Sequence, residues 1–233
     1  MTKLAFPPAV PVTLPIIGQE SRFPVRRIYC VGKNYAEHIS EMGGDGKKAK
    51  AQRSEPVFFT KAAETLVESG QSIKYPPNTS DLHHEVELVV AIGPTEVNGE
   101  NGSAGVEIYA YGVGIDMTRR DLQASAKTKG GPWDRAKNFR QSAPCSALTP
   151  ANEVDLSEAH IVLRKNGDIV QHAALKDMIW SVEEIIEHLK TDMDLQPGDL
   201  IYTGTPSGVG PVIIGDELSG GAEGLERITV RFV

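Results

Sequence analysis

The sequence has few cysteines, and they form no recognisable pair. Only Cys30 and Cys145 are present among the 233 residues, far apart in the chain and outside any spaced motif. A disulfide framework is therefore excluded, and two reduced thiols are typical of a cytoplasmic protein. One long-range disulfide between the two remains compatible with the sequence.

Long apolar runs, targeting signals and an excess of basic residues are also missing. No stretch approaches the roughly 18 consecutive apolar residues of a membrane-spanning helix. The proline-rich residues 1–20 lack the basic-then-apolar pattern of a signal peptide. Because 24 lysines and arginines face 31 acidic residues, the net charge is −7. We therefore expect a cytoplasmic protein without a nucleic-acid or membrane partner.

What is present is the composition of an ordinary globular protein, with 40% hydrophobic and 24% charged residues. Strand patterns outnumber helix patterns, most connections carry turn residues, and no internal repeat occurs. We therefore expect an α+β fold that is rich in strands, with a few peripheral helices. Residues 1–26 are expected to run extended over the surface, because proline blocks helices and sheet ladders. Residues 27–233 are expected to form a single domain.

Local patterns predict most of the individual elements. Strands are predicted at 27–32, 56–61, 84–92, 109–116, 160–165, 168–172, 200–203 and 228–232, and helices at 34–42, 121–129 and 181–189. Asn34 is the predicted N-cap of the first helix, and Ser181 begins the last helix with the spacing of a capping box. Asn166-Gly167 predicts a tight hairpin. Residues 44–53 are typical of an exposed loop or fraying helix, and residues 98–105 of a polar break.

Two glutamates share one face of a predicted strand. Glu85 and Glu87 alternate with apolar residues, so strand periodicity places both carboxylates on the same side. Val89 and Ala91 continue that side as apolar, and two carboxylates entering an apolar face are costly unless a cation compensates them. A half-exposed strand with two solvated glutamates is the alternative. His83, on the same face, either supports the carboxylates or ends the strand.

Asp116 ends another predicted strand, and small residues precede it on its face. Ala110, Gly112 and Gly114 would let a ligand or another backbone come close. A turn-capping aspartate is the alternative. If Asp116 joins the two glutamates, three oxygen ligands favour a hard ion such as Mg²⁺. Zinc is less favoured, because cysteine ligands and a spaced histidine pair are lacking.

His38 and Glu41 lie three residues apart on a predicted helix and therefore share a face. A carboxylate beside an imidazole fixes its tautomer and raises its basicity, which prepares a general base. An exposed ion pair is the alternative. Between residues 116 and 140, seven basic residues stand against three acids. Such an excess attracts an anionic substrate, or it is simply a solvated face. Residues 204–210 lack the lysine and helix of a phosphate loop.

Four segments, in this order, resemble the fumarylacetoacetate hydrolase family. They are Tyr29-Cys-Val-Gly-Lys-Asn-Tyr-Ala-Glu-His38, His83-His-Glu-Val-Glu-Leu88, Gly114-Ile-Asp-Met-Thr-Arg-Arg-Asp121 and Gly198-Asp-Leu-Ile-Tyr-Thr-Gly-Thr-Pro206. The resemblance extends from about Arg27 to the last residue. Within the family, the proline-rich start, residues 22–27 and residues 141–144 are similar to the branch of fumarylpyruvate hydrolases of gentisate breakdown.

This resemblance implies the mixed β-sandwich roll of the family's C-terminal catalytic domain over residues 27–233, and a homodimer. It implies Mg²⁺ or Mn²⁺ on the three carboxylates Glu85, Glu87 and Asp116, and a water prepared by His38 and Glu41. It also implies that Gln123 and Lys137 lie near the reacting carbonyl. Substrate contacts are implied for Lys61, Arg120 and Thr205. We expect this protein to differ from other members of the family at Lys33 and at residues 43–53, which would form part of a mobile lid.

The implied activity is metal-dependent hydrolysis of a carbon–carbon bond in a small anionic 2,4-diketo acid. Fumarylpyruvate, cleaved to fumarate and pyruvate, is the expected substrate. An oxaloacetate decarboxylase or a diketo-acid isomerase would use the same site without the water. A catalytically silent metal-binding paralogue is the non-enzyme alternative, and the histidine–glutamate pair argues against it because a structural metal site does not need one.

Overall fold

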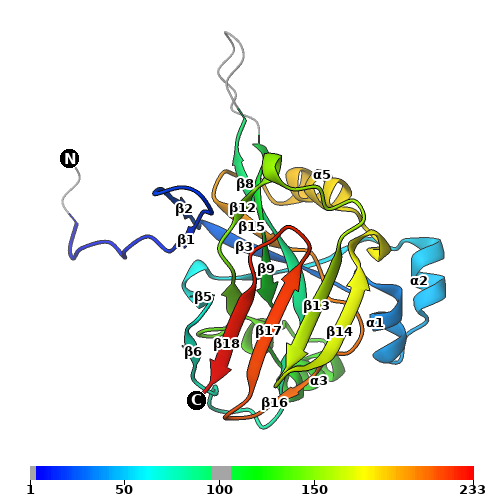
Figure 1. The fold of residues 1–233 in the computed structure, drawn as a ribbon. Coiled ribbons are helices and arrows are strands. Elements are labelled where there is room, and N and C mark those ends of the chain that lie inside the picture. The colour runs from blue at the N-terminus through cyan, green and yellow to red at the C-terminus, as the bar shows by residue number, and fades with distance from the viewer. Residues whose placement is uncertain (1–3, 96–105) are drawn as a thin grey trace.

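The computed structural model describes residues 4–95 and 106–233, and β-sheets dominate it (Figure 1). The largest sheet has eight strands in the order β4-β3-β15-β8-β9-β11-β5, with β12 also paired to β9. Its strands are β3 (Arg27–Gly32), β4 (Val57–Lys61), β5 (Leu66–Glu68), β8 (Val86–Pro94), β9 (Val106–Ile115), β11 (Ala143–Cys145), β12 (Thr149–Pro150) and β15 (Asp199–Tyr202). Parallel and antiparallel pairs both occur in it, so the sheet is mixed.

Three smaller sheets and the helices complete the fold. A five-stranded sheet, ordered β14-β13-β17-β18-β6, contains β6 (Ser72–Ile73), β13 (His160–Lys165), β14 (Asp168–Ala174), β17 (Glu217–Ala222) and β18 (Ile228–Phe232). A three-stranded sheet contains β7 (Leu82–His84), β10 (Thr118–Arg119) and β16 (Gly210–Val212), and β1 (Thr13–Pro15) pairs with β2 (Arg22–Pro24). The helices are α1 (Ala36–Glu41), α2 (Gly46–Gln52), α3 (Arg120–Lys129), α4 (Asp134–Lys137) and α5 (Val182–Asp192), with 3₁₀ turns at Ala63–Thr65, Ala151–Glu153 and Leu175–Asp177. The predicted β-rich α+β class is confirmed.

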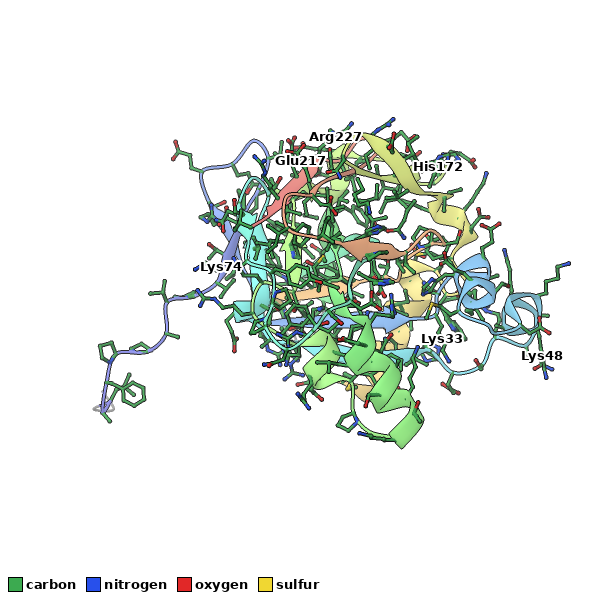
Figure 2. The ribbon with its side chains drawn as sticks, turned by 90° about the horizontal axis from the view of Figure 1, so that it is seen from below. Lys33, Lys48, Lys74, His172, Glu217 and Arg227 are labelled. Carbon is green, nitrogen blue, oxygen red and sulfur yellow. The ribbon has the colours of Figure 1, made fainter. Side chains whose placement is uncertain are left out.

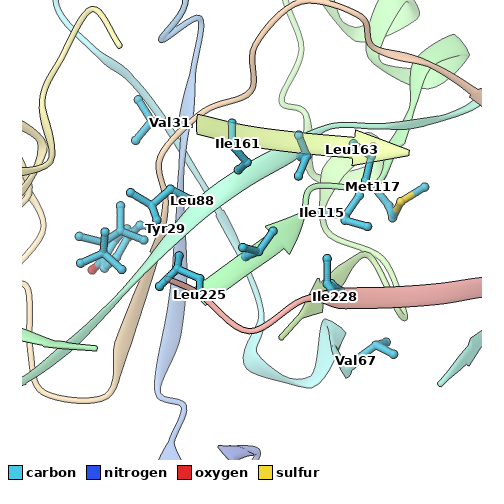
Figure 3. Packing of buried hydrophobic residues seen from close by; sticks show 14 of the residues in the cluster. Tyr29, Val31, Val67, Leu88, Ile115, Met117, Ile161, Leu163, Leu225 and Ile228 are labelled. Carbon is cyan, nitrogen blue, oxygen red and sulfur yellow. The ribbon is translucent and has the colours of Figure 1, made fainter. Parts of the chain in front are cut away.

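The main core lies between the large sheet and the five-stranded sheet. Leu88 and Ile115 of the large sheet share it with Ile161, Leu163 and Ile228 of the five-stranded sheet (Figure 3). Burying such side chains contributes about 1.5–3 kcal/mol each. The opposite face of the large sheet packs in a second cluster, which is why β8 is apolar on both faces.

Strand β9 departs from simple alternation. Consecutive residues Ala91 and Ile92 of β8 pair with Ala110 and Ile108, so Tyr109 is an extra, bulged residue of β9. As a result Tyr109 packs in the second cluster beside Ala110, whereas the alternation predicted the two on opposite faces. At Gly114 the expected close approach is made by a side chain: a Cβ there would lie 2.5 Å from a ring carbon of Tyr202.

The N-terminal segment is more structured than its prolines predict. Residues 4–12 form neither helix nor strand and leave the body of the protein (Figure 1). Residues 13–24, however, form an antiparallel ladder in which Leu14 pairs with Phe23 and both are buried. Pro15 and Pro24 stand at the ends of these short strands, where a missing N–H does little harm. The expectation that prolines exclude a ladder here is wrong, and the boundary at residue 26 stays a prediction.

The predicted helices at 34–42, 121–129 and 181–189 are confirmed within a few residues at each end, as is the capping box of Ser181. The Asn34 cap is wrong: α1 begins after Tyr35, and the Asn34 amide instead bonds the backbone of Trp180 and Thr203. Residues 46–52 form a complete short helix, capped by Asp45.

The Asn166-Gly167 hairpin is confirmed, with φ of 54° and 96° at its two central residues. The polar break predicted at 98–105 lies outside the described residues. Within the described part of the chain, no helix is long and apolar enough to cross a membrane.

Candidate active site

The two central strands bring the three predicted carboxylates together. Glu85 directly precedes β8, Glu87 lies in it, and Asp116 directly follows β9. Because β8 and β9 are antiparallel, with Val86 opposite Ile115, the start of one strand meets the end of the other. The Asp116 N–H donates to the Glu85 carbonyl at 2.8 Å. All three side chains are buried, and each offers a carboxylate oxygen within 4.8 Å of the others.

Two buried lysines contact this carboxylate group. The Lys137 ammonium donates to Glu85 Oε2 and Asp116 Oδ2, both at 2.6 Å, and to Thr118 Oγ1 at 2.7 Å. Lys61 Nζ lies 2.8 Å from Asp116 Oδ1. Burial lowers the pKa of Lys137, but the charges of Asp116 and Glu85 outweigh it and hold that pKa above its usual value. Lys137 is therefore a fixed cation and not a base.

The carboxylate oxygens suit a hard divalent cation. Among the described residues, the buried Asp116 Oδ1 forms an ion pair with Lys61 but accepts no hydrogen bond, and the Lys61 ammonium donates to the backbone carbonyls of Met117 and Lys137. Burial, and then the charges of Asp116 and Glu85, raise the pKa of Glu87 well above its usual range. An unsatisfied buried oxygen and a carboxyl that resists ionisation are what a cation would relieve. An all-oxygen donor set is the one that Mg²⁺ and Mn²⁺ prefer.

Arg120 connects the carboxylates to the rest of the site. Its Nη2 donates to Glu85 Oε1 at 2.5 Å and its Nη1 to Gln123 Oε1 at 2.6 Å. Its Nε donates to His83 Nδ1 at 3.4 Å, and His83 Nε2 in turn lies 2.8 Å from Asp81. Burial raises the pKa of Glu85, but Lys137 and Arg120 together hold it below its usual value. His83 thus supports the arginine.

His38 and Glu41 meet at the end of α1. His38 Nδ1 lies 3.3 Å from Glu41 Oε2, while Glu41 Oε1 accepts the N–H of Gly208 at 3.0 Å. If Nδ1–H donates to the carboxylate, Nε2 carries the free lone pair. Burial lowers the pKa of His38, and the opposing effects of Glu85 and Glu41 do not restore it. Glu41 therefore raises the basicity of the imidazole, as expected, but burial has the larger effect and the pKa of His38 lies below its usual value.

Eight of the ten predicted site residues line one cavity of about 260 Å³. They are His38, Glu85, Glu87, Asp116, Arg120, Gln123, Lys137 and Thr205. Glu41 and Lys61 lie outside the lining and contact His38 and Asp116 respectively. Residues from five separate segments of the chain therefore form a single site.

The cavity also contains residues to which the sequence assigned no catalytic, substrate-binding or metal-binding role. Apolar and aromatic side chains form part of the wall, together with two lysines; they are Ile39, Met42, Phe59, Trp133, Lys33 and Lys127. The basic excess between residues 116 and 140 was the available signal for Lys127. The aromatic residues gave none, because their pattern is that of ordinary core positions.

Gln171 of β14 is a positioning residue that the sequence also does not reveal. Its Oε1 accepts from the Val86 N–H at 3.0 Å and lies 3.1 Å from His84 Nδ1. Its Nε2 donates to Thr205 Oγ1 at 2.8 Å and to the Pro206 carbonyl at 2.9 Å. One buried amide thus fixes the threonine of the cavity relative to the strand that carries the glutamates.

Comparisons with known proteins point to one family. The family model described as "Fumarylacetoacetate (FAA) hydrolase C-terminal" matches residues 27–233. The chain is 44% identical to a fumarylpyruvate hydrolase of Ralstonia sp over 79% of this chain and 96% of that protein. It is 39% identical to the oxaloacetate tautomerase YcgM of Escherichia coli K12 over 84% and 88% of the two chains.

Solved structures agree with this relationship. The fold matches a crystal structure of fumarylpyruvate hydrolase from Pseudomonas aeruginosa in complex with Mn²⁺ and pyruvate, with a TM-score of 0.88, 40% identity and 99% of each chain covered. Sequence similarity and fold similarity thus extend over nearly the whole chain. The protein belongs to the fumarylacetoacetate hydrolase family.

Proposed function

We propose that this protein is a metal-dependent hydrolase that cleaves fumarylpyruvate to fumarate and pyruvate. The observation that supports it most directly is one cavity that is lined both by three buried carboxylates and by His38, which Glu41 contacts. The first feature suits a divalent cation and the second suits activation of a water, and hydrolysis of a diketo acid needs both. The relatives named as fumarylpyruvate hydrolases support this choice of substrate.

Glu85, Glu87 and Asp116 would hold Mg²⁺ or Mn²⁺. When bound, the cation supplies Lewis acidity toward the carboxylate and 2-keto oxygens of the substrate and toward enolate charge at that end. Arg120 and Lys61 hold two of the carboxylates in place. Thr205, held by Gln171, would contact the substrate carboxylate, as the family resemblance implies.

Hydrolysis begins when His38 Nε2 takes a proton from water and the water oxygen adds to the C4 carbonyl carbon. The oxyanion that forms is stabilised by Lys137, which is a fixed cation, and by Gln123. Because Gln123 Oε1 already accepts from Arg120, its amide nitrogen is oriented to donate. The C3–C4 bond then breaks, its electron pair stays on C3 as the enolate of pyruvate, and the proton held by His38 returns to C3.

The direct test follows fumarylpyruvate consumption by the purified protein in Mg²⁺ or Mn²⁺, with fumarate and pyruvate quantified. His38→Ala should lower turnover by about 10²-fold or more, with metal binding retained. Glu85→Ala should abolish metal-dependent turnover. Full activity in excess chelator, or undiminished turnover by His38→Ala, contradicts the proposal.

A second candidate is oxaloacetate tautomerase activity, which the 38–40% identity to several proteins of that name favours. Enol–keto exchange needs proton transfer at C3 but no attack by water. Following the oxaloacetate enol in the same preparation separates the two reactions, and carbon dioxide release tests decarboxylation. Absence of turnover on every substrate would favour a silent metal-binding protein. The homodimer stays a prediction, to be measured by light scattering.

A further inference from the structure

The side chains that line the cavity include more positive charges than negative charges. Four cationic side chains line it, against the three carboxylates. Lys137 and Arg120 are paired with those carboxylates. Within the described parts of the chain, Lys33 and Lys127 form no ion pair with any carboxylate. If a divalent cation is added on the three acids, the two lysines are excess charge that faces a cavity.

The two lysines stand at the mouth, opposite the buried floor. Both are exposed, whereas the three carboxylates and Lys137 are buried. Lys33 follows β3, and Lys127 comes from α3. Figure 2 shows Lys33 between the helices α1 and α2 on one side and α3 on the other. The cavity therefore has cations at both ends. Those at the floor contact the carboxylates, and the two lysines at the mouth pair with no carboxylate in residues 4–95 and 106–233.

Lys33 is held in an unusual backbone conformation. Its φ is 63°, in the left-handed region that costs free energy for any residue with a Cβ and favours glycine. The next residue, Asn34, fixes this turn through hydrogen bonds to Trp180 and Thr203 at 2.7–3.0 Å. A lysine where glycine would fit better is consistent with a use for its amine.

Lys127 is near enough to the other cations to be affected by them. Burial, and then the charges of Arg120 and Lys33, lower the pKa of its amine. The charge of Glu85 opposes this effect only in part, and the ring centroid of Trp133 lies 5.4 Å from Nζ. Repulsion of this kind is relieved when an anion binds between the cations.

We propose that Lys33 and Lys127 form a second anion subsite, at the mouth of the cavity, for the distal carboxylate of a dicarboxylic 2-oxo acid. The inference rests on the proposed function, in which the 2-oxo carboxylate occupies the floor. It makes the two lysines the residues that select fumarylpyruvate over diketo acids with an uncharged end, such as acetylpyruvate.

The test measures binding of two unreactive probes to the Mn²⁺-loaded protein by calorimetry. 2-Oxopimelate has the chain length of fumarylpyruvate and a carboxylate at each end, whereas 2-oxoheptanoate lacks the distal carboxylate. Neither has the 4-keto group that hydrolysis requires. The wild type should bind 2-oxopimelate about tenfold more tightly or better, as expected for a charge-assisted contact.

Three variants identify the residues. Lys127→Met and Lys33→Gly should each reduce the preference, and the double variant should abolish it; glycine also removes the strain at φ 63°, so loss of folding is not expected. Lys129→Met, which removes the same charge from an exposed position of the same helix, is the control and should keep the preference. The ratio of kcat/KM on fumarylpyruvate to that on acetylpyruvate should fall in parallel.

Equal binding of both probes by the wild type, or a preference that survives in the double variant, overturns the subsite. A preference that depends on the lysines in a protein that does not hydrolyse fumarylpyruvate keeps the subsite and overturns the proposed function. Normal hydrolysis with unchanged selectivity in the double variant overturns the subsite alone. Failure of both probes to bind the wild type counts against both.

Discussion

Glu87 is the position where metal binding and folding stability can be separated. Glu87→Gln removes an ionisable buried carboxyl but keeps a side-chain oxygen to accept the Gly204 N–H, which Glu87 accepts at 2.8 Å. With ligand oxygens within 4.8 Å, a pair of carboxylates repels by about 3 kcal/mol at an effective dielectric constant of about 20. Lys137 and Arg120 contact Glu85 and Asp116, whereas no described cation contacts Glu87. Because protonation relieves part of the repulsion, the metal-free variant should be about 1–2 kcal/mol more stable than the wild type.

Metal should reverse that order. At a concentration of about 100 times its Kd, a ligand stabilises the native state by about 2.7 kcal/mol. For a domain of this size, 1 kcal/mol corresponds to roughly 2–4 °C in Tm, so the wild type should gain about 5–10 °C. Glu87→Gln should lose most of this gain, since a neutral amide is a poor ligand for a hard cation.

The assay is scanning calorimetry at pH 7.5 in excess chelator and in excess Mn²⁺. Glu217→Gln, on the exposed position of β17 labelled in Figure 2, is the matched control and should behave as the wild type in both conditions. Two results would refute the reasoning. One is a metal-induced gain in the variant equal to that of the wild type, and the other is a metal-free variant markedly less stable than the wild type.

Three further predictions concern other parts of the site and its support. Glu41 opposes the burial that lowers the pKa of His38. Glu41→Gln should therefore move the acid limb of the pH profile of kcat/KM to lower pH and reduce kcat about tenfold or more. An acid limb at the same pH as in the wild type would contradict this role of Glu41. Gly114→Ala should destabilise the fold by about 3 kcal/mol in urea unfolding, because its methyl would lie 2.5 Å from the ring of Tyr202. Unchanged stability would show that the neighbouring strands move apart to accommodate the methyl group. Gln171→Ala should cost about 2–3 kcal/mol by the same measurement, since it leaves several buried partners without a hydrogen bond; equal stability would mean that water replaces the amide.

Local sequence patterns predicted the elements that depend on neighbouring residues. The capping box of α5 and the tight turn at Asn166-Gly167 are confirmed, because both are satisfied within a few residues of the chain. The Asn34 cap failed since distant backbone groups, at Trp180 and Thr203, compete for the same side chain. The bulge that turns Tyr109 to the other face depends on pairing with a second strand, which no single-strand pattern contains.

The features of the site also fall into those that local patterns predicted and those that only the fold brings together. Period-2 alternation alone placed Glu85 and Glu87 on one face, and the apolar residues around them made a cation the physical expectation. Alternation could not place Asp116 beside them, since that follows from the antiparallel register of β8 and β9. It also could not show that burial leaves His38 with a lowered pKa.

The sequence by itself therefore determined the β-rich class, the carboxylate pair and, through its motifs, the family. The tertiary structure alone decided which distant residues meet: the Lys137 ammonium between two carboxylates, the Gln171 amide beside Thr205, and two lysines at the mouth of one cavity that pair with no described carboxylate. The physical reason is that periodicity fixes the face on which a side chain lies, whereas contacts, burial and the charges they bring together depend on how the sheets pack.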